Sequence, residues 1–185
     1  MEINKLKGSI IGVISENFEL VDYNNLLVKD IITKKTDDSL KMVGIHENIK
    51  NMEFNELTDK DKSKVILASK LNSKEIILYD FTKGMLNKEL LFFKNLFKKL
   101  VTYDKKVILV SKDINFFLNL VDNLYVINKD EVVFETNDFF NYELYKYVDM
   151  PPIISFIKKC QINNIMVENY TEFNELLKAV YRIKQ

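Results

Sequence analysis

The chain has 185 residues, 47% of them hydrophobic, and its 27 Lys and Arg balance its 27 Asp and Glu. This length and composition predict one folded domain and exclude a disordered chain. The balanced charge gives no electrostatic reason to expect nucleic acid or an anionic membrane surface as a partner.

Two rare residue types limit the chemistry further. Cys160 is the only cysteine and His46 the only histidine, which excludes an internal disulfide, a cysteine-based zinc site and a multi-histidine metal site. We expect Cys160 to be a half-buried structural thiol and His46 to lie in a loop or at a helix start. The sequence shows no signal peptide, and its apolar runs are far shorter than the ~20 residues that span a bilayer, so we expect a cytoplasmic protein.

Short apolar runs alternate with helical patterns along the chain. The polar run of residues 36–39, which begins with Thr36, is expected to cap the first clear helix, and Thr58 or Asp59 the second. The helix over residues 87–101 shows a wide apolar face, and the turn at residues 128–130 joins two strands as a hairpin. The predicted strands are residues 9–14, 75–79, 107–110, 124–127 and 132–135, and the predicted helices are residues 36–43, 58–71, 87–101, 115–121, 138–146, 152–159 and 171–182.

Apolar four- to six-residue strands separated by helices are typical of an α/β protein, a layered sheet with helices on both faces. Ligands bind at the carboxyl ends of the strands in such a sheet. The residues expected there are Ser15 with Glu16, Asp80 with Phe81, and residues 111–113.

The order and spacing of these residues resemble the nucleotide-binding subunits of ABC transporters, closest to the ATPases of energy-coupling-factor systems for cobalt or vitamin uptake. The similar stretches are residues 11–17 (strand leading into the Q-loop), 28–31 (the segment after it), 40–45 and 56–58 (approach to the signature motif), 75–85 (Walker B strand and D-loop), 107–114 (H-loop strand), 124–133 (closing hairpin), and 148–152 with 171–177 (carboxyl-terminal extension).

The resemblance implies a truncated P-loop NTPase-like fold. It predicts a single ABC ATPase-like domain over residues 1–185, with a reduced helical subdomain in residues 31–73 and a helical carboxyl-terminal extension in residues 148–185. Because the chain begins just before the strand assigned to the Q-loop, we expect the preceding strands and the phosphate-binding helix to be absent.

The family's chemistry does not accompany the resemblance. The phosphate-binding motif G-x-x-x-x-G-K-[ST] does not occur in the sequence. Glu16 stands at the Q-loop glutamine position, and Thr58 and Asp59 stand within the segment that matches the signature L-S-G-G-Q. The D-loop match, residues 84–86, lacks the family's aspartate.

The remaining family positions are at the ends of two predicted strands. Asp80 matches the Walker B aspartate, but Phe81 occupies the position of the catalytic glutamate and cannot accept a proton from water. Lys112 occupies the position of the switch histidine, and Asp113 follows it as in the family. We therefore expect a pseudo-ATPase with no catalytic residue and with neither ATP nor Mg²⁺ as cofactor.

Three hypotheses about function follow. The first is a non-catalytic interaction or regulatory subunit that binds a second copy, an intact ABC ATPase or a membrane coupling subunit, and lies at the membrane only through that partner. The second uses Asp80, Glu16 and Asp113 to bind a nucleotide or a divalent metal through oxygen ligands; the simpler interpretation pairs these acids with Lys112, Lys83 or backbone amides. The third is a remnant without a selected role.

The clustered aromatic residues either form an exposed contact surface or belong to the hydrophobic core, and we expect at least half of them to be core residues. They are Phe92, Phe93, Phe116, Phe117, Phe139, Phe140, Tyr142, Tyr145 and Tyr147.

Overall fold

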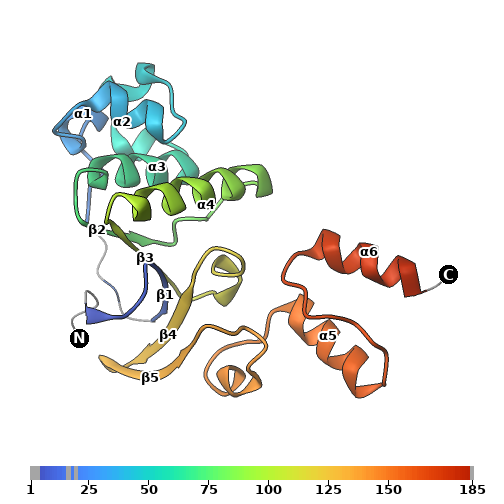
Figure 1. Ribbon diagram of the computed structural model, residues 1–185. Helices are drawn as coiled ribbons and strands as arrows, with labels where there is room; N and C mark the ends of the chain where they lie inside the picture. Colours follow the sequence, from blue (N-terminus) through green and yellow to red (C-terminus); the bar gives the residue numbers. More distant parts are fainter. Residues whose placement is uncertain (1–4, 16–17, 19–20, 184–185) are drawn as a thin grey trace.

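The computed structural model describes residues 5–15, 18 and 21–183 (Figure 1). A five-stranded sheet forms its centre, with the strand order β2-β3-β1-β4-β5. The strands are β1 (Ile10–Ile14), β2 (Glu75–Tyr79), β3 (Lys106–Ser111), β4 (Asn123–Asn128) and β5 (Glu131–Thr136). The first four run parallel, and β5 pairs antiparallel with β4. All five predicted strands are confirmed.

The hairpin between β4 and β5 turns on two residues in the left-handed region, Lys129 (φ 48°) and Asp130 (φ 65°). Positive φ at both central residues defines a type I′ turn, which matches the twist of the flanking strands. The predicted hairpin is therefore confirmed, and β4 and β5 stay in register up to a shift between Val126 and Ile127.

Side chains alternate strictly across the sheet. In β1, Ile10 and Ile14 belong to the cluster on one face, whereas Ile11 and Val13 belong to the cluster on the other. The first face packs against residues of α1 to α4. The second-face cluster contains strand residues together with Leu6 and Phe18. The predicted α/β sheet is present, and in the part of the chain that the structure describes, helix residues join the cluster on one face only.

The helices mostly begin and end where the apolar pattern predicts. They are α1 (Val28–Ile31), α2 (Thr36–Met42), α3 (Asp59–Lys70), α4 (Asn87–Thr102), α5 (Pro152–Ile162) and α6 (Phe173–Ile183), with 3₁₀ turns at Glu47–Asn51, Phe54–Glu56, Ile114–Phe116 and Tyr142–Lys146. No helix in the described residues is long and apolar enough to cross a membrane.

Two predicted helices are wrong. The segment 115–121 forms only the 3₁₀ turn Ile114–Phe116, and the left-handed Asn119 (φ 66°) prevents a longer helix. The segment 138–146 shortens to the 3₁₀ turn Tyr142–Lys146.

The two predicted helix caps have different outcomes. Thr58 caps α3, because its Oγ1 accepts a hydrogen bond from the Asp61 amide at 3.2 Å. Thr36 is not a cap. It lies inside α2, and its hydroxyl donates instead to the carbonyl of Ile32, four residues back, at 2.8 Å.

Cys160 and His46 both have structural roles. Cys160 is buried in a small carboxyl-terminal cluster. His46 precedes a 3₁₀ turn, and its Nδ1 accepts a hydrogen bond from the Asn48 amide at 3.2 Å. Both predictions of a structural position hold, although Cys160 is more deeply buried than expected.

The apolar face of α4 is narrower than predicted. Phe93, Phe97 and Leu100 are buried against the sheet, but Leu91 is 60% exposed. Most of the clustered aromatic residues are buried or half-buried, as expected, with Phe92 and Tyr147 as the exposed members.

Helices α5 and α6 lie beside the sheet (Figure 1) and share a small cluster of their own, made of Ile157, Cys160, Val167 and Leu176. Asn119 joins this pair to the segment after β3: its Nδ2 donates to the carbonyl of Thr171 at 3.2 Å, and the Thr171 hydroxyl donates back to Asn119 Oδ1. The pair falls within residues 148–185, where the resemblance predicts an extension.

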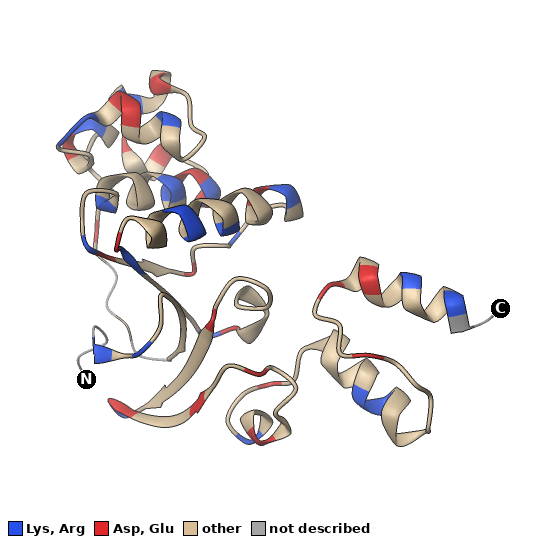
Figure 2. Ribbon diagram, in the orientation of Figure 1, with Lys and Arg blue, Asp and Glu red and all other residues tan. Residues whose placement is uncertain are grey.

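A largely buried ion pair joins α3 to α4. Lys64, whose side chain is 9% exposed, lies 3.1 Å from Glu89 Oε1, and Lys60 lies 3.3 Å from the same oxygen. The Leu86 amide donates to Glu89 Oε2. The Leu86 amide, followed by Lys64 and Lys60, lowers the pKa of Glu89 to about 2. Apart from this ion pair, acidic and basic residues are both distributed over α1 to α3 and α6 (Figure 2).

We predict that Glu89→Gln lowers the free energy of unfolding at pH 7 by about 2 kcal/mol, because it leaves the Lys64 ammonium buried without its counterion. The pKa of Glu89 is depressed in the folded state, so its stabilisation is complete above pH 4.5 and is lost as the pH falls towards 2. Urea unfolding at pH 7, 4 and 3 should show the difference between wild type and variant shrinking. Glu175→Gln, in an exposed pair with Lys178, is the control, and an equal effect of both variants would contradict the account.

Candidate functional site

The carboxyl ends of the parallel strands form one edge of the sheet, and most of the predicted site residues lie along it. Ser15 follows β1, Asp80 follows β2, and Lys112 follows β3. Backbone hydrogen bonds continue the sheet past its last residues, from the Ser15 amide to the Ser111 carbonyl (3.3 Å) and from the Asp80 amide to the Val110 carbonyl (2.9 Å). The sheet therefore fixes the backbone of this edge.

Asp80 is bound to a neighbouring strand by its side chain. Its Oδ1 accepts a hydrogen bond from Ser111 Oγ at 2.6 Å, and Ser111 is 2% exposed. The Ser111 hydroxyl also accepts from the Asp113 amide at 3.2 Å. Asp80 takes a left-handed backbone (φ 43°), a conformation that Asp tolerates better than most residues. The carboxylate thus connects the ends of β2 and β3.

The pairing expected for Asp80 was partly wrong. Its hydrogen-bond partner is the hydroxyl of Ser111 rather than Lys83 or Lys112. Lys83 instead forms an ion pair with Asp59 at 3.0 Å, and both of these side chains are exposed. Ser111 carried no predicted role, although a small polar residue directly after an apolar strand is a signal for this kind of contact.

Asp113 has a local role. Its Oδ1 accepts hydrogen bonds from the backbone amide (2.9 Å) and the side-chain Nδ2 (2.6 Å) of Asn115, so it caps the 3₁₀ turn Ile114–Phe116. Among the described residues, no group of three or more Asp, Glu, His or Cys is arranged to hold a metal. Glu16, the third predicted acid, lies outside the described residues.

Phe81 lies inside the core rather than at the edge. It is 3% exposed, and its ring meets Phe93 edge-on at 4.9 Å between centroids (89° between planes) and Phe97 at 5.4 Å. Both partners are buried residues of α4. The Phe81 side chain therefore packs α4 onto the sheet.

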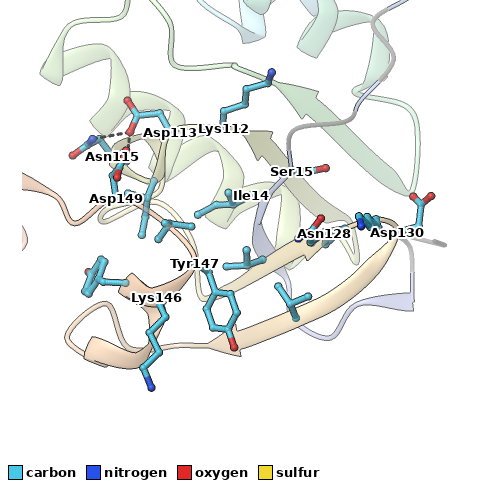
Figure 3. A pocket seen from close by; sticks show the side chains of 17 residues that line it. Ile14, Ser15, Lys112, Asp113, Asn115, Asn128, Asp130, Lys146, Tyr147 and Asp149 are labelled. Carbon is cyan, nitrogen blue, oxygen red and sulfur yellow. Dashed lines mark hydrogen bonds between the residues drawn. The ribbon is translucent and has the colours of Figure 1, made fainter.

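A cavity of about 800 Å³ opens at the same edge, on the side of β4 (Figure 3). Its wall includes Ile14, Lys112 and residues 145–149. Lys112 and Lys146 extend outward in opposite directions (Figure 3). Their ammonium groups therefore do not converge, and Lys129 is a third lysine in the cavity wall.

The residues that the structure describes after β1 do not follow the pattern of a P-loop. A P-loop is a strand, a glycine-rich loop and a helix in direct succession. The sequence has no glycine between Gly12 and Gly44, and the first helix that the described residues form after β1 is α1, which starts at Val28. Phe18, in this segment, stacks on Tyr79 of β2 at 5.0 Å.

The place of β1 in the sheet can be compared with the family segment that the resemblance assigns to it. The resemblance assigns residues 11–17 to the strand that leads into the Q-loop. In the structure β1 is the central strand, between β3 and β4. It is therefore separated by β3 from β2, the strand assigned to Walker B. Thr58 and Asp59, the residues in the signature-like segment, begin α3 as its cap and first residue.

Comparisons with known proteins support the fold. No protein-family model matches the sequence, and no curated protein is similar to it. Among solved structures, the chain is similar to the ATP-binding cassette MJ0796 in a dimeric post-hydrolysis state with ADP and Pi: 23% identity, TM-score 0.50, covering 70% of this chain and 63% of that one. It is also similar to an inward-facing metal-chelate type ABC transporter, with 13% identity and a TM-score of 0.52, covering 71% of this chain and 72% of that one.

These similarities show an ABC ATPase-like α/β fold over about 70% of the chain. The chain spans 63% of the length of the MJ0796 cassette. Phe81, which the resemblance matches to the catalytic glutamate, is buried in the core.

We predict that Phe81→Glu lowers the free energy of unfolding by about 3–5 kcal/mol, because it removes a core ring and buries a carboxylate among aromatic side chains. Phe92→Glu is the matched control, since Phe92 lies on the same helix as Phe93 but is 45% exposed; its cost should stay below about 1 kcal/mol. Denaturant titrations of the two variants give the comparison. Equal stabilities would mean that Phe81 does not lie in the core.

Thr82 gives a second prediction. It is 6% exposed, and its Oγ1 has no hydrogen-bond partner among the described residues. Because Val has the same shape without the hydroxyl, Thr82→Val should leave the stability unchanged or raise it by about 1 kcal/mol. Thr58→Val removes the cap of α3 and should instead cost about 1 kcal/mol. Thermal melts of both variants test this, and destabilisation by Thr82→Val would show that its hydroxyl has a partner.

Proposed function

We propose that this protein is a non-hydrolysing ABC ATPase-like protein that acts through its contacts with other proteins, as an interaction or regulatory subunit related to energy-coupling transporters. The observation that carries the proposal is the burial of Phe81 between Phe93 and Phe97. A water-activating group at this position must reach the edge of the sheet, whereas this side chain points into the core. Phosphoryl transfer to water depends on positioned groups of this kind.

The surroundings of Phe81 support the same proposal. The Asp80 carboxylate is engaged by Ser111, and Lys112 extends away from the neighbouring cavity. The described residues after β1 do not enter a helix until Val28, so they offer no helix N-terminus to a phosphate. Asp80 thus has a structural partner at the position where a nucleotide-binding role would be expected.

The partner is proposed from the fold and from the resemblance together. An ABC-type fold without hydrolytic chemistry retains surfaces with which to contact a second copy, an intact ABC ATPase or a membrane coupling subunit. Association with such a subunit would bring the protein to the membrane surface. The similar MJ0796 cassette is dimeric, and for this chain a dimer, homotypic or with an intact ATPase, is part of the proposal.

The test is an ATPase and binding assay on the whole chain. We expect no turnover of Mg²⁺-ATP above buffer and no shift of the melting temperature. Binding at a hundred times Kd would add about 2.7 kcal/mol and raise the melting temperature by about 5–10 °C, so the two outcomes are easily separated.

An Asp80→Asn variant is the control. Turnover or a melting shift that disappears in Asp80→Asn would contradict the proposal and favour the hypothesis in which Asp80, Glu16 and Asp113 bind a nucleotide or a metal. A parallel titration with Mg²⁺ or Ca²⁺ alone distinguishes metal binding from nucleotide binding.

A further inference from the structure

The edge of the sheet at which β1, β2 and β3 begin carries far more positive than negative charge. Three segments form it: residues 5–9 lead into β1, residues 70–75 join α3 to β2, and residues 98–106 join α4 to β3. Since the whole chain has no net charge, the net charge of +6 on these segments, here called the basic edge, is balanced elsewhere in the chain. The charged residues of the basic edge are eight lysines, Lys5, Lys7, Lys70, Lys74, Lys98, Lys99, Lys105 and Lys106, and two acids, Glu75 and Asp104.

Backbone contacts hold the three segments of the basic edge side by side. The Lys106 amide donates to the Lys74 carbonyl at 2.9 Å. The Val107 amide donates to the Ser9 carbonyl, also at 2.9 Å, and α4 ends at Thr102, shortly before β3 begins. Because neighbouring strands lie about 4.8 Å apart, the starts of β2, β3 and β1 fall within about 10 Å. This span is close to the Debye length of about 8 Å at physiological salt, so the charges act together on a partner.

Most lysines of the basic edge have no carboxylate partner in the part of the chain that the structure describes. The Lys105 ammonium donates to the Ser73 carbonyl at 2.8 Å, which leaves its charge in place. The nearby Asp122 carboxylate, directly before β4, accepts a hydrogen bond from the Ile10 amide at 3.2 Å. The basic edge therefore presents uncompensated positive charge to the solvent. The lysines that form no ion pair with another described residue are Lys7, Lys70, Lys74, Lys98, Lys99 and Lys105.

We propose that the basic edge binds the anionic headgroups of a lipid membrane surface. Clusters of about four to eight basic residues are attracted to a surface that contains phosphatidylserine, and this attraction needs no shaped pocket. Tyr103, between Lys99 and Lys105 in sequence, is 65% exposed. Its apolar ring and polar hydroxyl suit the headgroup level of a bilayer. This inference goes beyond the proposed function, because the chain contacts lipid directly rather than through a partner subunit.

The make-up of the basic edge favours a lipid surface over nucleic acid. All of its cations are lysines, which act as point charges on flexible stems, whereas arginine supplies the planar fork that pairs with phosphates and base edges. A nucleic-acid groove also admits a helix or a β-ribbon, but here strands begin and helices end. The balanced charge of the whole sequence gave no reason to expect a membrane surface because it averages over this edge.

Vesicle flotation of the whole chain tests the proposal. The wild type should float with vesicles made of equal amounts of phosphatidylserine and phosphatidylcholine, and not with phosphatidylcholine alone. About 1 M NaCl should release it, because the Debye length then falls to about 3 Å. Replacing three exposed lysines together, in the variant Lys74→Gln, Lys98→Gln and Lys99→Gln, should lower the partition coefficient by about a hundredfold.

The matched control removes the same charge from exposed positions outside the basic edge, in the variant Lys34→Gln, Lys41→Gln and Lys159→Gln, and should float like the wild type. An equal loss of binding in both triple variants would overturn the proposal, as would a wild type that ignores the anionic vesicles or floats equally with phosphatidylcholine alone. Binding of a duplex DNA oligonucleotide without binding of vesicles would show a nucleic-acid surface instead. Circular dichroism establishes that all variants are folded. An active ATPase would contradict the proposed function but leave this test unaffected.

Discussion

The contact of Phe81 with Phe93 and Phe97 is the interaction on which the rest of the structure depends. It joins the end of β2 to α4, and α4 in turn holds α3 through Glu89 and Lys64. A side chain that packs a helix in this way cannot also lie at an open edge. The same contact that stabilises the fold therefore keeps the Phe81 side chain away from the carboxyl edge of the sheet.

The polar side chains at the carboxyl edge of the sheet also make contacts within the chain. Asp80 is held by Ser111, Ser111 receives the Asp113 amide, and Asp113 caps the turn that follows. These hydrogen bonds satisfy polar groups where β2 and β3 end, and buried polar groups without partners are costly. At this edge Asp80 connects β2 with β3, and Asp113 caps the 3₁₀ turn that follows β3. The sheet itself is of the ABC ATPase-like kind.

The sequence predicted the centre of the sheet well because β1 and β3 are short apolar runs that are buried on both faces, as Ile10, Ile11 and Val13 show. It failed where one residue decides the backbone: Asn119 in the left-handed region ends a segment whose apolar pattern looks helical. It also failed for side-chain direction. Phe81 lies two residues beyond the end of β2, where the alternation of the strand no longer determines which way a side chain points, so its burial was not predictable. The exposure of Phe173, Leu177 and Tyr181 on α6 was missed because an apolar periodicity does not reveal which of its residues find partners.

At the carboxyl edge of the sheet, Asp80, Ser111 and Asp113 have hydrogen-bond partners within the chain. Helix α6, in contrast, exposes apolar side chains to solvent. The most direct test of the central claim is an NMR titration of the isotope-labelled chain with Mg²⁺-ATP, following the backbone amides of Asp80, Ser111 and Asp113. We expect the chemical shifts of these amides to stay unchanged. Saturable shifts at all three would show that the edge binds nucleotide, and would contradict it.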